Sequence, residues 1–535
     1  MKKHLKIGTP IIILSLFILT LSPLPARAQK ELTKSRGEIR VVESWRPDVN
    51  VLGHNVLQYL FEYALDRNEL APSLGISKEW IDDTTLEVKL RQGVSFTNGE
   101  PFDAYAVKFN FDYQRLHNPS RGVQVYMKNV KEIQVIDPHT VRMDLDQPDA
   151  LLWNRILPQP ISGWVIGAPK YMERVGWDEF MKRPVGTGPY MVEGVVKDYR
   201  KMAEGEVYAT LVANPGYWNE GYPNIRKITF VRHSPKEALR AVIEGRVDLV
   251  TSLIPKDTLK VAESPYSKVV KGRQDVTCTM AQLNLMSTHT LPLRDMRVRK
   301  ALNYAVNKEE LFRYAFKGNA VEMRGILTEK SGVDLSGTEP YEWNIPKARE
   351  LLKDAGYGEG FKMKLFYLEK DYLTVYLLRR FYSLLKIEVE ITPVDWEWIV
   401  RHIVYPNTHE GYSWEDEYWW IILYSVPSNV PELMGGILEW GWHSGAAWQT
   451  SPDWLMVPLD RMYDKLFKTK DKESRFQIYK EANEYMADQA LWVFTMAPLS
   501  LYGVNEEMEF IPQLSQYLYL DYSSVTDNHW SVRGE

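Results

Sequence analysis

Residues 234–250, SPKEALRAVIEGRVDLV, hold a complete passage from helix to strand. Ser234 and Glu237 have the spacing of a capping box with proline at the first helical position, and Gly245 is placed to end the helix. Residues 247–250 then form a short, mostly apolar run that indicates a strand. A helix that leads directly into a strand is the basic unit of a mixed α/β fold.

The same signals recur on both sides of this stretch. Asp295 is placed to cap a helix, and a further helix runs from about Pro346 to Gly356 before an alternating strand at residues 363–367. Alternating apolar residues also predict strands near residues 86–90 and 141–145. Because strands and helices interleave throughout, we expect the α/β class and neither a β-sandwich nor a helical bundle.

The length of the chain predicts more than one lobe. It has 535 residues, 45% of them hydrophobic and 25% charged, as is typical of soluble globular proteins of two or more domains. No internal repeat or low-complexity linker is visible. We therefore expect the chain to pass between lobes along ordered segments, as in hinged proteins.

The N-terminus has the pattern of a secretory signal peptide. Lysines precede an apolar run from Ile11 to Leu21, and Ala26-Arg27-Ala28 supplies the small residues of a cleavage site. Eleven residues are too few to cross a bilayer core of about 30 Å. We expect cleavage after Ala28 and a freely diffusing protein of the periplasm.

Charge and cysteine content exclude further classes. Without residues 1–28 the chain has 61 Lys and Arg against 70 Asp and Glu, a net charge of −9, and no basic stripe. Nucleic-acid binding is therefore not expected, since it depends on phosphate neutralisation. The single cysteine, Cys278, excludes an internal disulfide and is interpreted as a small buried residue.

No catalytic motif is present. In residues 441–445, GWHSG, the serine stands one place late for a nucleophile elbow, and neither an H-E-x-x-H nor a Walker A sequence occurs. We expect no enzyme activity, no cofactor, no catalytic residue and no resident metal. A secreted hydrolase, or a chaperone or sensor adaptor of the same fold, remains as an alternative.

Several stretches together resemble extracellular solute-binding protein family 5, the oligopeptide, dipeptide and nickel class that serves ABC importers. They occur in family order and cover nearly the whole chain after residue 28. The stretches are residues 70–80 (LAPSLGISKEW), 85–104 (TLEVKLRQGVSFTNGEPFDA), 185–190 (VGTGPY), 214–218 (NPGYW), 241–248 (AVIEGRVD), 293–302 (LRDMRVRKAL) and 348–357 (ARELLKDAGY).

The resemblance implies a two-lobed periplasmic-binding-protein fold of the Venus flytrap type, with a discontinuous first lobe and an inserted α+β subdomain. The first lobe is expected to use residues 29–60, 185–283 and 496–535. The insert is expected at residues 61–184 and the second lobe at residues 284–495. The glycines of residues 186–188 are expected to form a turn before a strand, and not a phosphate loop, because the third glycine of that fingerprint is missing.

The resemblance also places the ligand. Peptide-binding relatives pair an aspartate of the second lobe with the peptide's amino group, and the matching stretch here, residues 419–431, contains no acid. Matching Tyr424 to the family pattern puts Leu423 at that position. Ordinary free-amino peptides are therefore disfavoured, because an enclosed ammonium without a counter-charge loses roughly 3–5 kcal/mol. Lys370 lies near the place of a carboxylate-binding arginine of some relatives, and we interpret it as a surface lysine.

Aromatic residues are dense in the same region, and flat indole rings suit sugars, aromatic groups, quaternary amines and peptide side chains. The region contains Trp396, Trp398, Trp414, Trp419, Trp420, Tyr424, Trp440, Trp442 and Trp448. The loop around Trp440 and Trp442 is the preferred contact, and Trp45 with Arg46 is its expected counterpart on the first lobe. The predicted ligand-binding residues are Trp45, Arg46, Trp414, Trp420, Tyr424, Trp440, Trp442 and His443.

The function implied by this resemblance is capture of a peptide-like or other small organic solute between two hinged lobes. The expected partners are that solute and an inner-membrane ABC permease, with the binding protein itself a monomer. Oligosaccharides and metal chelates are alternative ligands.

Overall fold

The computed structural model describes most of the chain after residue 34. The predicted signal peptide lies outside the described residues. The described ranges are 35–43, 51–63, 70–117, 127–152, 164–251, 253–272, 277–286, 291–404, 420–427, 443–446, 448–512 and 518–533. Within these ranges, no helix combines the length and the apolar character needed to cross a membrane.

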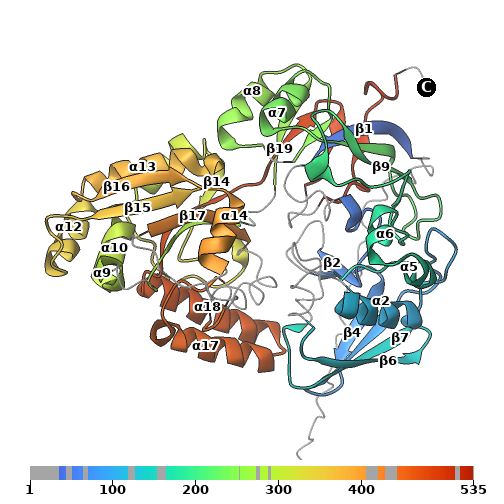
Figure 1. The fold of residues 1–535 in the computed structure, drawn as a ribbon, viewed down its shortest axis with the longest axis horizontal. Coiled ribbons are helices and arrows are strands. Elements are labelled where there is room, and N and C mark those ends of the chain that lie inside the picture. Colours follow the sequence, from blue (N-terminus) through green and yellow to red (C-terminus); the bar gives the residue numbers. More distant parts are fainter. Residues whose placement is uncertain are drawn as a thin grey trace, which may run out of the picture.

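A seven-stranded sheet, with the helices packed against it, forms what we call the first lobe (Figure 1). Its strands come from three distant parts of the sequence, and β1 lies at the centre, parallel to both of its neighbours. In sheet order they are β12 (Ser267–Lys271), β19 (Leu501–Asn505), β11 (Leu249–Val250), β1 (Arg36–Val42), β10 (Ile225–Val231), β9 (Val207–Ala213) and β8 (Tyr190–Val192).

A six-stranded sheet forms the core of the second lobe. Its order is β14 (Ala320–Glu322), β18 (Trp492–Pro498), β13 (Thr277–Leu283), β17 (Trp420–Pro427), β15 (Lys362–Tyr367) and β16 (Glu388–Pro393). Its main helices are α10 (Met296–Tyr304), α12 (Ile345–Asp354), α13 (Tyr372–Ser383), α17 (Asp453–Lys468) and α18 (Lys472–Asp488). Side chains from these helices and strands share one large apolar core.

Two chain segments connect the sheets, and they lie side by side. One follows β12 and the other joins β18 to β19, and the Gly272 amide donates to the Ser500 carbonyl at 2.7 Å. The expected lobe boundaries at residues 283 and 495 lie near these connections and stay a prediction. β13 pairs with β17 and β18, so the chain enters the second sheet at Thr277, and β18 keeps it there until Pro498.

The insert has its own four-stranded antiparallel sheet, covered by α2 (Ala104–His117). The sheet order is β4 (Gly75–Trp80), β5 (Thr85–Leu90), β7 (Thr140–Leu145) and β6 (Val130–Asp137). Two later helices, α5 (Pro169–Val175) and α6 (Trp177–Lys182), place Met172 and Phe180 in the core of the first lobe. The expected insert of residues 61–184 therefore shares its last part with that core.

The predicted helix caps are confirmed. The side chain of Ser234 accepts a hydrogen bond from the Glu237 amide at the start of α7 (Pro235–Ile243), and Asp295 caps α10 in the same way. The turn at residues 186–188 precedes β8. A Cβ at Gly186 would lie 2.0 Å from the Val56 carbonyl oxygen, so close backbone approach requires glycine there.

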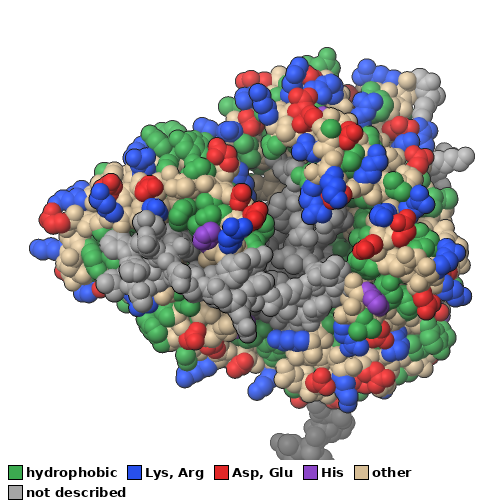
Figure 2. Space-filling view, in the orientation of Figure 1, with side chains coloured by type: hydrophobic (Ala, Val, Ile, Leu, Met, Phe, Trp, Pro, Cys, Tyr) green, Lys and Arg blue, Asp and Glu red, His purple; other side chains and the backbone are tan. Residues whose placement is uncertain are grey.

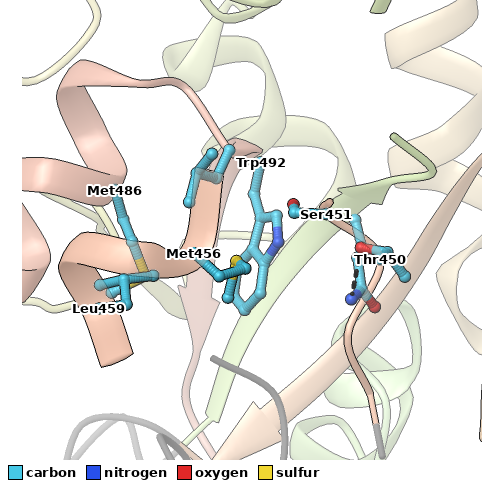
Figure 3. A pocket seen from close by; sticks show the side chains of 8 residues that line it. Thr450, Ser451, Met456, Leu459, Met486 and Trp492 are labelled. Carbon is cyan, nitrogen blue, oxygen red and sulfur yellow. Dashed lines mark hydrogen bonds between the residues drawn. The ribbon is translucent and has the colours of Figure 1, made fainter. Parts of the chain in front are cut away.

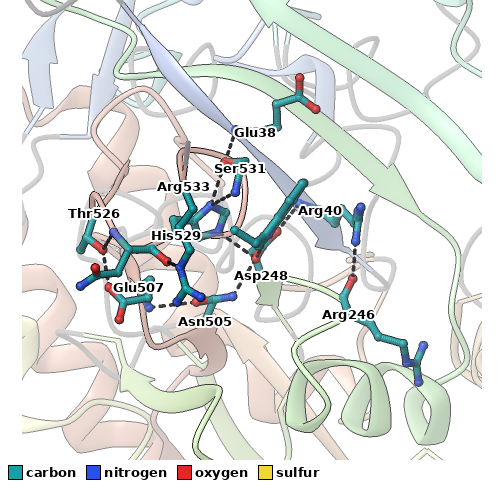
Figure 4. A network of polar contacts seen from close by, with 12 residues as sticks. Glu38, Arg40, Arg246, Asp248, Asn505, Glu507, Thr526, His529, Ser531 and Arg533 are labelled. Carbon is teal, nitrogen blue, oxygen red and sulfur yellow. Dashed lines mark hydrogen bonds and ion pairs between the residues drawn. The ribbon is translucent and has the colours of Figure 1, made fainter. Parts of the chain in front are cut away.

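A buried carboxylate, that of Asp248, helps to attach the C-terminal segment to the first sheet (Figure 4). Its oxygens accept from the Arg40 amide at 2.7 Å and from the Asn505 side chain at 2.9 Å. They also contact His529 Nε2 at 3.0 Å and Trp530 Nε1 at 2.9 Å. Asp248, the last residue of one family-like stretch, therefore joins three parts of the first lobe.

Candidate ligand-binding site

Three parallel strands of the second sheet end at the same edge. β15 runs parallel to both β16 and β17, so Tyr367, Pro393 and Leu423 lie level at a common carboxyl edge. β17 continues past this edge to Pro427. In open α/β sheets, ligands bind outside the carboxyl ends of the strands. Figure 1 shows α14 (Trp396–Ile399), which follows β16, on the side of the second lobe that faces the first. We take this edge as the candidate site.

Aromatic rings cover part of this edge, and we call Trp396, Trp398 and Trp448 the aromatic ledge. Asp395 caps α14 by accepting from the Trp398 amide at 2.8 Å. The Trp398 ring lies 4.2 Å from that of His402, nearly parallel to it, and the Trp396 and Trp448 rings are 5.6 Å apart. Trp396 is 56% exposed, so the ledge offers an open indole face to a solute.

Tyrosines extend the aromatic surface along α13. Tyr367, the last residue of β15, lies 6.0 Å from Tyr372, which lies 6.2 Å from Tyr376. Tyr372 and Tyr376 are exposed, whereas Tyr367 is buried. Burial, with a contribution from Glu369, raises the pKa of the Tyr367 hydroxyl, which therefore stays protonated as a hydrogen-bond donor. Lys370 is exposed, in agreement with its interpretation as a surface lysine.

Most of the predicted ligand-binding side chains fall outside the described residues. This applies to Trp45, Arg46, Trp414, Trp440 and Trp442.

The other predicted residues are described only in part. The backbone of Trp420 and Tyr424 lies in β17, where both occupy the same face of the strand, opposite to that of Leu423. His443 is described in full, and its ring stacks on Tyr463 of α17 at 4.5 Å. The role of these residues in ligand binding stays a prediction.

On the first lobe, a buried ionic cluster follows residues 44–50, the segment that holds Trp45 and Arg46. His54 lies between two carboxylates, with Nδ1 2.8 Å from Glu62 and Nε2 3.1 Å from Asp521. Its ring stacks on Tyr519 at 3.8 Å. Burial alone would lower the His54 pKa, but the two carboxylates outweigh it and raise the pKa to about 10. His54 is therefore a cation at neutral pH and links the segment that contains Glu62 to the C-terminal segment that contains Asp521.

A small pocket in the second lobe does not fit a solute (Figure 3). It encloses at most about 240 Å³, less than the roughly 300–1,000 Å³ of typical ligand pockets. Met456, Met486 and Trp492 line its apolar side. On its polar side Gln282 donates to Thr450 at 2.9 Å and to the Trp448 carbonyl at 2.8 Å. Gln282, which lines the pocket, therefore also holds the backbone of Trp448, a residue of the aromatic ledge.

The insert contacts the second lobe directly. The Ala150 amide donates to the Phe467 carbonyl near the end of α17 at 2.7 Å, and Leu151 is fully buried in the second lobe's core. Close by, Lys470 bonds Asp83 at 2.7 Å and lies 5.3 Å from the Trp80 ring. The lobes are therefore joined at the two connections and again through the insert.

Charges of both signs are interspersed over the described surface shown in Figure 2. Many of the described ion pairs are exposed pairs close in sequence, such as Arg240 with Glu244, and others join distant segments, such as Lys480 with Asp334. No large region of one sign stands out in that view.

Comparison with known families identifies the chain. Residues 68–432 match the family described as "Bacterial extracellular solute-binding proteins, family 5 Middle". The chain belongs to this family, which consists of solute-binding proteins and not of enzymes.

Curated relatives match over part of their length. The glutathione-binding protein GsiB of Salmonella paratyphi A is 32% identical over 304 residues, which is 56% of this chain and 55% of the relative. GsiB of Shigella flexneri is 31% identical over 303 residues, with the same shares. The matched region thus spans about half the length of these relatives.

Solved structures match the fold along nearly the whole chain. The periplasmic binding protein DppA of Helicobacter pylori, in complex with the peptide STSA, has a TM-score of 0.70 and 20% identity, covering 93% of this chain and 100% of its own. NikA of Brucella suis, in complex with Fe(III)-EDTA, has a TM-score of 0.72 and 20% identity, covering 91% and 100%. The predicted α/β fold of two lobes is thereby confirmed.

Sequence reasoning did not select two features of the edge. Trp396 and Trp448 belong to the aromatic-rich region but were not among the predicted ligand-binding residues. Asp371, the neighbour of Lys370, was not considered as a site residue. The rule that ligands bind at the carboxyl ends of strands could have selected Asp371 and Trp396, because they are among the first residues after β15 and β16.

Proposed function

We propose that this chain is the solute-binding component of an ABC importer and that it captures a peptide-like solute between its two lobes. The carrying observation is the pair of adjacent connections together with the aromatic edge of the second sheet on the side of the first lobe. Two neighbouring connections allow a hinge rotation, and a solute that touches both lobes favours the closed form. The solute leaves chemically unchanged.

The peptide-like class rests on the relatives. GsiB is named for glutathione and DppA was solved with a tetrapeptide, and these are a γ-linked tripeptide and a short linear peptide. The exposed indole of Trp396 and the tyrosines of α13 supply faces for the apolar parts of such solutes. The eight predicted residues, among them Trp45, Arg46 and Trp442, remain part of this proposal.

The proposal includes the route of the protein and its lobes. Residues 1–28 are removed as a signal peptide, and the rest acts in the periplasm as a monomer that delivers the solute to a permease. The second lobe is assigned residues 277–498, and the remaining described strands belong to the first lobe and its insert.

Calorimetric titration of the purified chain with STSA, glutathione and the nickel–histidine complex tests the function. We expect saturable binding of at least one peptide, with the solute recovered at unchanged mass by mass spectrometry. Binding of none of these solutes, or recovery of a cleaved peptide, would contradict the proposal.

Replacement of Trp442 tests the preferred contact loop. Trp442→Ala is expected to weaken capture of the bound peptide by about tenfold or more without unfolding the chain, as loss of a stacked ring does. Phe at the same position keeps a ring and serves as the matched control. An unchanged affinity of the Ala variant would remove this loop from the site.

A further inference from the structure

Asp371 stands out among the aspartates that precede helices of the second lobe. Asp295, Asp395 and Asp471 each accept a hydrogen bond from a backbone amide of the helix that follows. Asp371 also directly precedes α13, at the candidate edge, but it is the last residue of the 3-10 helix Glu369–Asp371 and its backbone is not extended as theirs is. Its side chain accepts no such bond. Its carboxyl group is therefore not used as a cap.

One oxygen of the Asp371 carboxyl also lacks any other partner among the described residues. Its Oδ2 atom is covered and has no hydrogen-bond partner in the described structure, whereas the residue as a whole is only half-buried. The covered oxygen thus belongs to a residue that is itself partly open to solvent. Burial raises its pKa to about 6, and Lys370 opposes this increase only in part. A carboxylate in this state is costly to keep, because a buried acceptor without a donor loses its hydration without compensation.

The surroundings of Asp371 favour a positive guest. Asp395 is a further acid at this edge, and Arg401 is already paired with Glu397 at 2.9 Å. Tyr372, the next residue along the chain, presents an exposed ring. A carboxylate beside aromatic faces is the combination that binds ammonium and guanidinium groups.

We propose that Asp371 receives a positively charged nitrogen of the solute, an ammonium or guanidinium group, and so supplies the counter-charge that residues 419–431 lack. This inference rests on the proposed function. It revises the expectation drawn from Leu423: a solute with a free amino group is accepted, but its charge is met after β15 and not in β17.

The test uses matched pairs of solutes that differ in one charge. STSA and glutathione are each titrated in the free-amino form and in the N-acetylated form. The wild type is expected to bind at least one free-amino form about 30-fold or more tightly than its acetylated counterpart. Equal affinities for both forms would overturn this inference alone, and binding of neither form of either pair would overturn the proposed function with it.

Two variants test which carboxylate of the protein meets the positive charge of the solute. Asp371→Asn is expected to lose the preference for the free-amino form, whereas Glu369→Gln, an exposed acid two residues away, keeps it within about twofold. Thermal unfolding of the ligand-free Asp371→Asn variant is expected at or above the wild-type temperature, since an uncompensated carboxylate is removed. A preference that survives in Asp371→Asn, or that falls equally in both variants, would contradict the assignment.

Discussion

Asp248 in the first lobe and Asp371 in the second both have a covered carboxylate oxygen, but their surroundings are opposite. The Asp248 carboxylate has four partners, contributed by Arg40, Asn505, His529 and Trp530. The covered Oδ2 of Asp371 has none among the described residues. A carboxylate with its donors in place stabilises the fold, whereas one without them loses stability and is available to a ligand. Burial alone does not distinguish a structural acid from a binding acid.

The largest effect is expected at Asp248. Asp248→Ala leaves buried donors without an acceptor and is expected to lower the free energy of unfolding by about 3–5 kcal/mol. Denaturant unfolding measures this loss. Asp527→Ala, which removes an exposed partner of Arg36 on the same C-terminal segment, should change stability by less than about 1 kcal/mol. A similar loss in both variants would contradict the distinction between satisfied and exposed acids.

A smaller, pH-dependent effect on the free energy of unfolding is expected at His54, because this residue is titratable and lies between two buried carboxylates. Its pKa is raised in the folded state to about 10, so its stabilising contribution is complete below the unfolded value near 6.5 and is lost as the pH rises towards 10. Denaturant unfolding of the wild type and of His54→Gln across pH 6 to 10 should therefore give curves that converge at alkaline pH. A constant difference between the two proteins would show that His54 is not charged in the fold.

At Asp371 the expected change in the free energy of unfolding has the opposite sign. Asp371→Asn, without ligand, is expected to raise the free energy of unfolding by about 1 kcal/mol, because desolvation of an unpaired charge is relieved. Denaturant unfolding of Asp371→Asn and of Asp248→Ala under the same conditions measures both changes in the free energy of unfolding on one scale. A loss of stability in Asp371→Asn would mean that its carboxyl has a structural donor, and the comparison between the two aspartates would fail.

The smallest effect is expected at the exposed ion pair between Asp83 and Lys470. Its partner Lys470 joins the insert to the second lobe, and Asp83 is 82% exposed. Lys470→Ala is expected to change both stability and solute affinity by less than about 1 kcal/mol, or fivefold, and less at high salt. Calorimetry at two salt concentrations measures this. A larger effect would show that the insert contact controls closure through this pair.

The sequence predicts best what depends on neighbours in the chain. The caps at Ser234 and Asp295, the strand before Asp371 and the turn at Gly186 all follow from local spacing and backbone sterics. The division into lobes stays a prediction. Its exact boundaries depend on pairings that no local pattern reveals, such as that of β13 with β17 and β18, which lie far away in sequence.

The eight ligand-binding residues named from the sequence stay a prediction. Aromatic composition drew attention to residues 396–448, but the exposure of Trp396 and the support of Trp448 by Gln282 depend on packing between distant segments. Asp371 has the same limitation, since an acid after a strand looks like an ordinary helix cap until its hydrogen bonds are known.

Small-angle X-ray scattering with and without a bound peptide tests the central claim most directly. The purified chain should contract when the peptide that calorimetry identifies is added to saturation, because the guest holds the two lobes together. A scattering profile that stays the same while calorimetry shows the peptide bound would contradict the account.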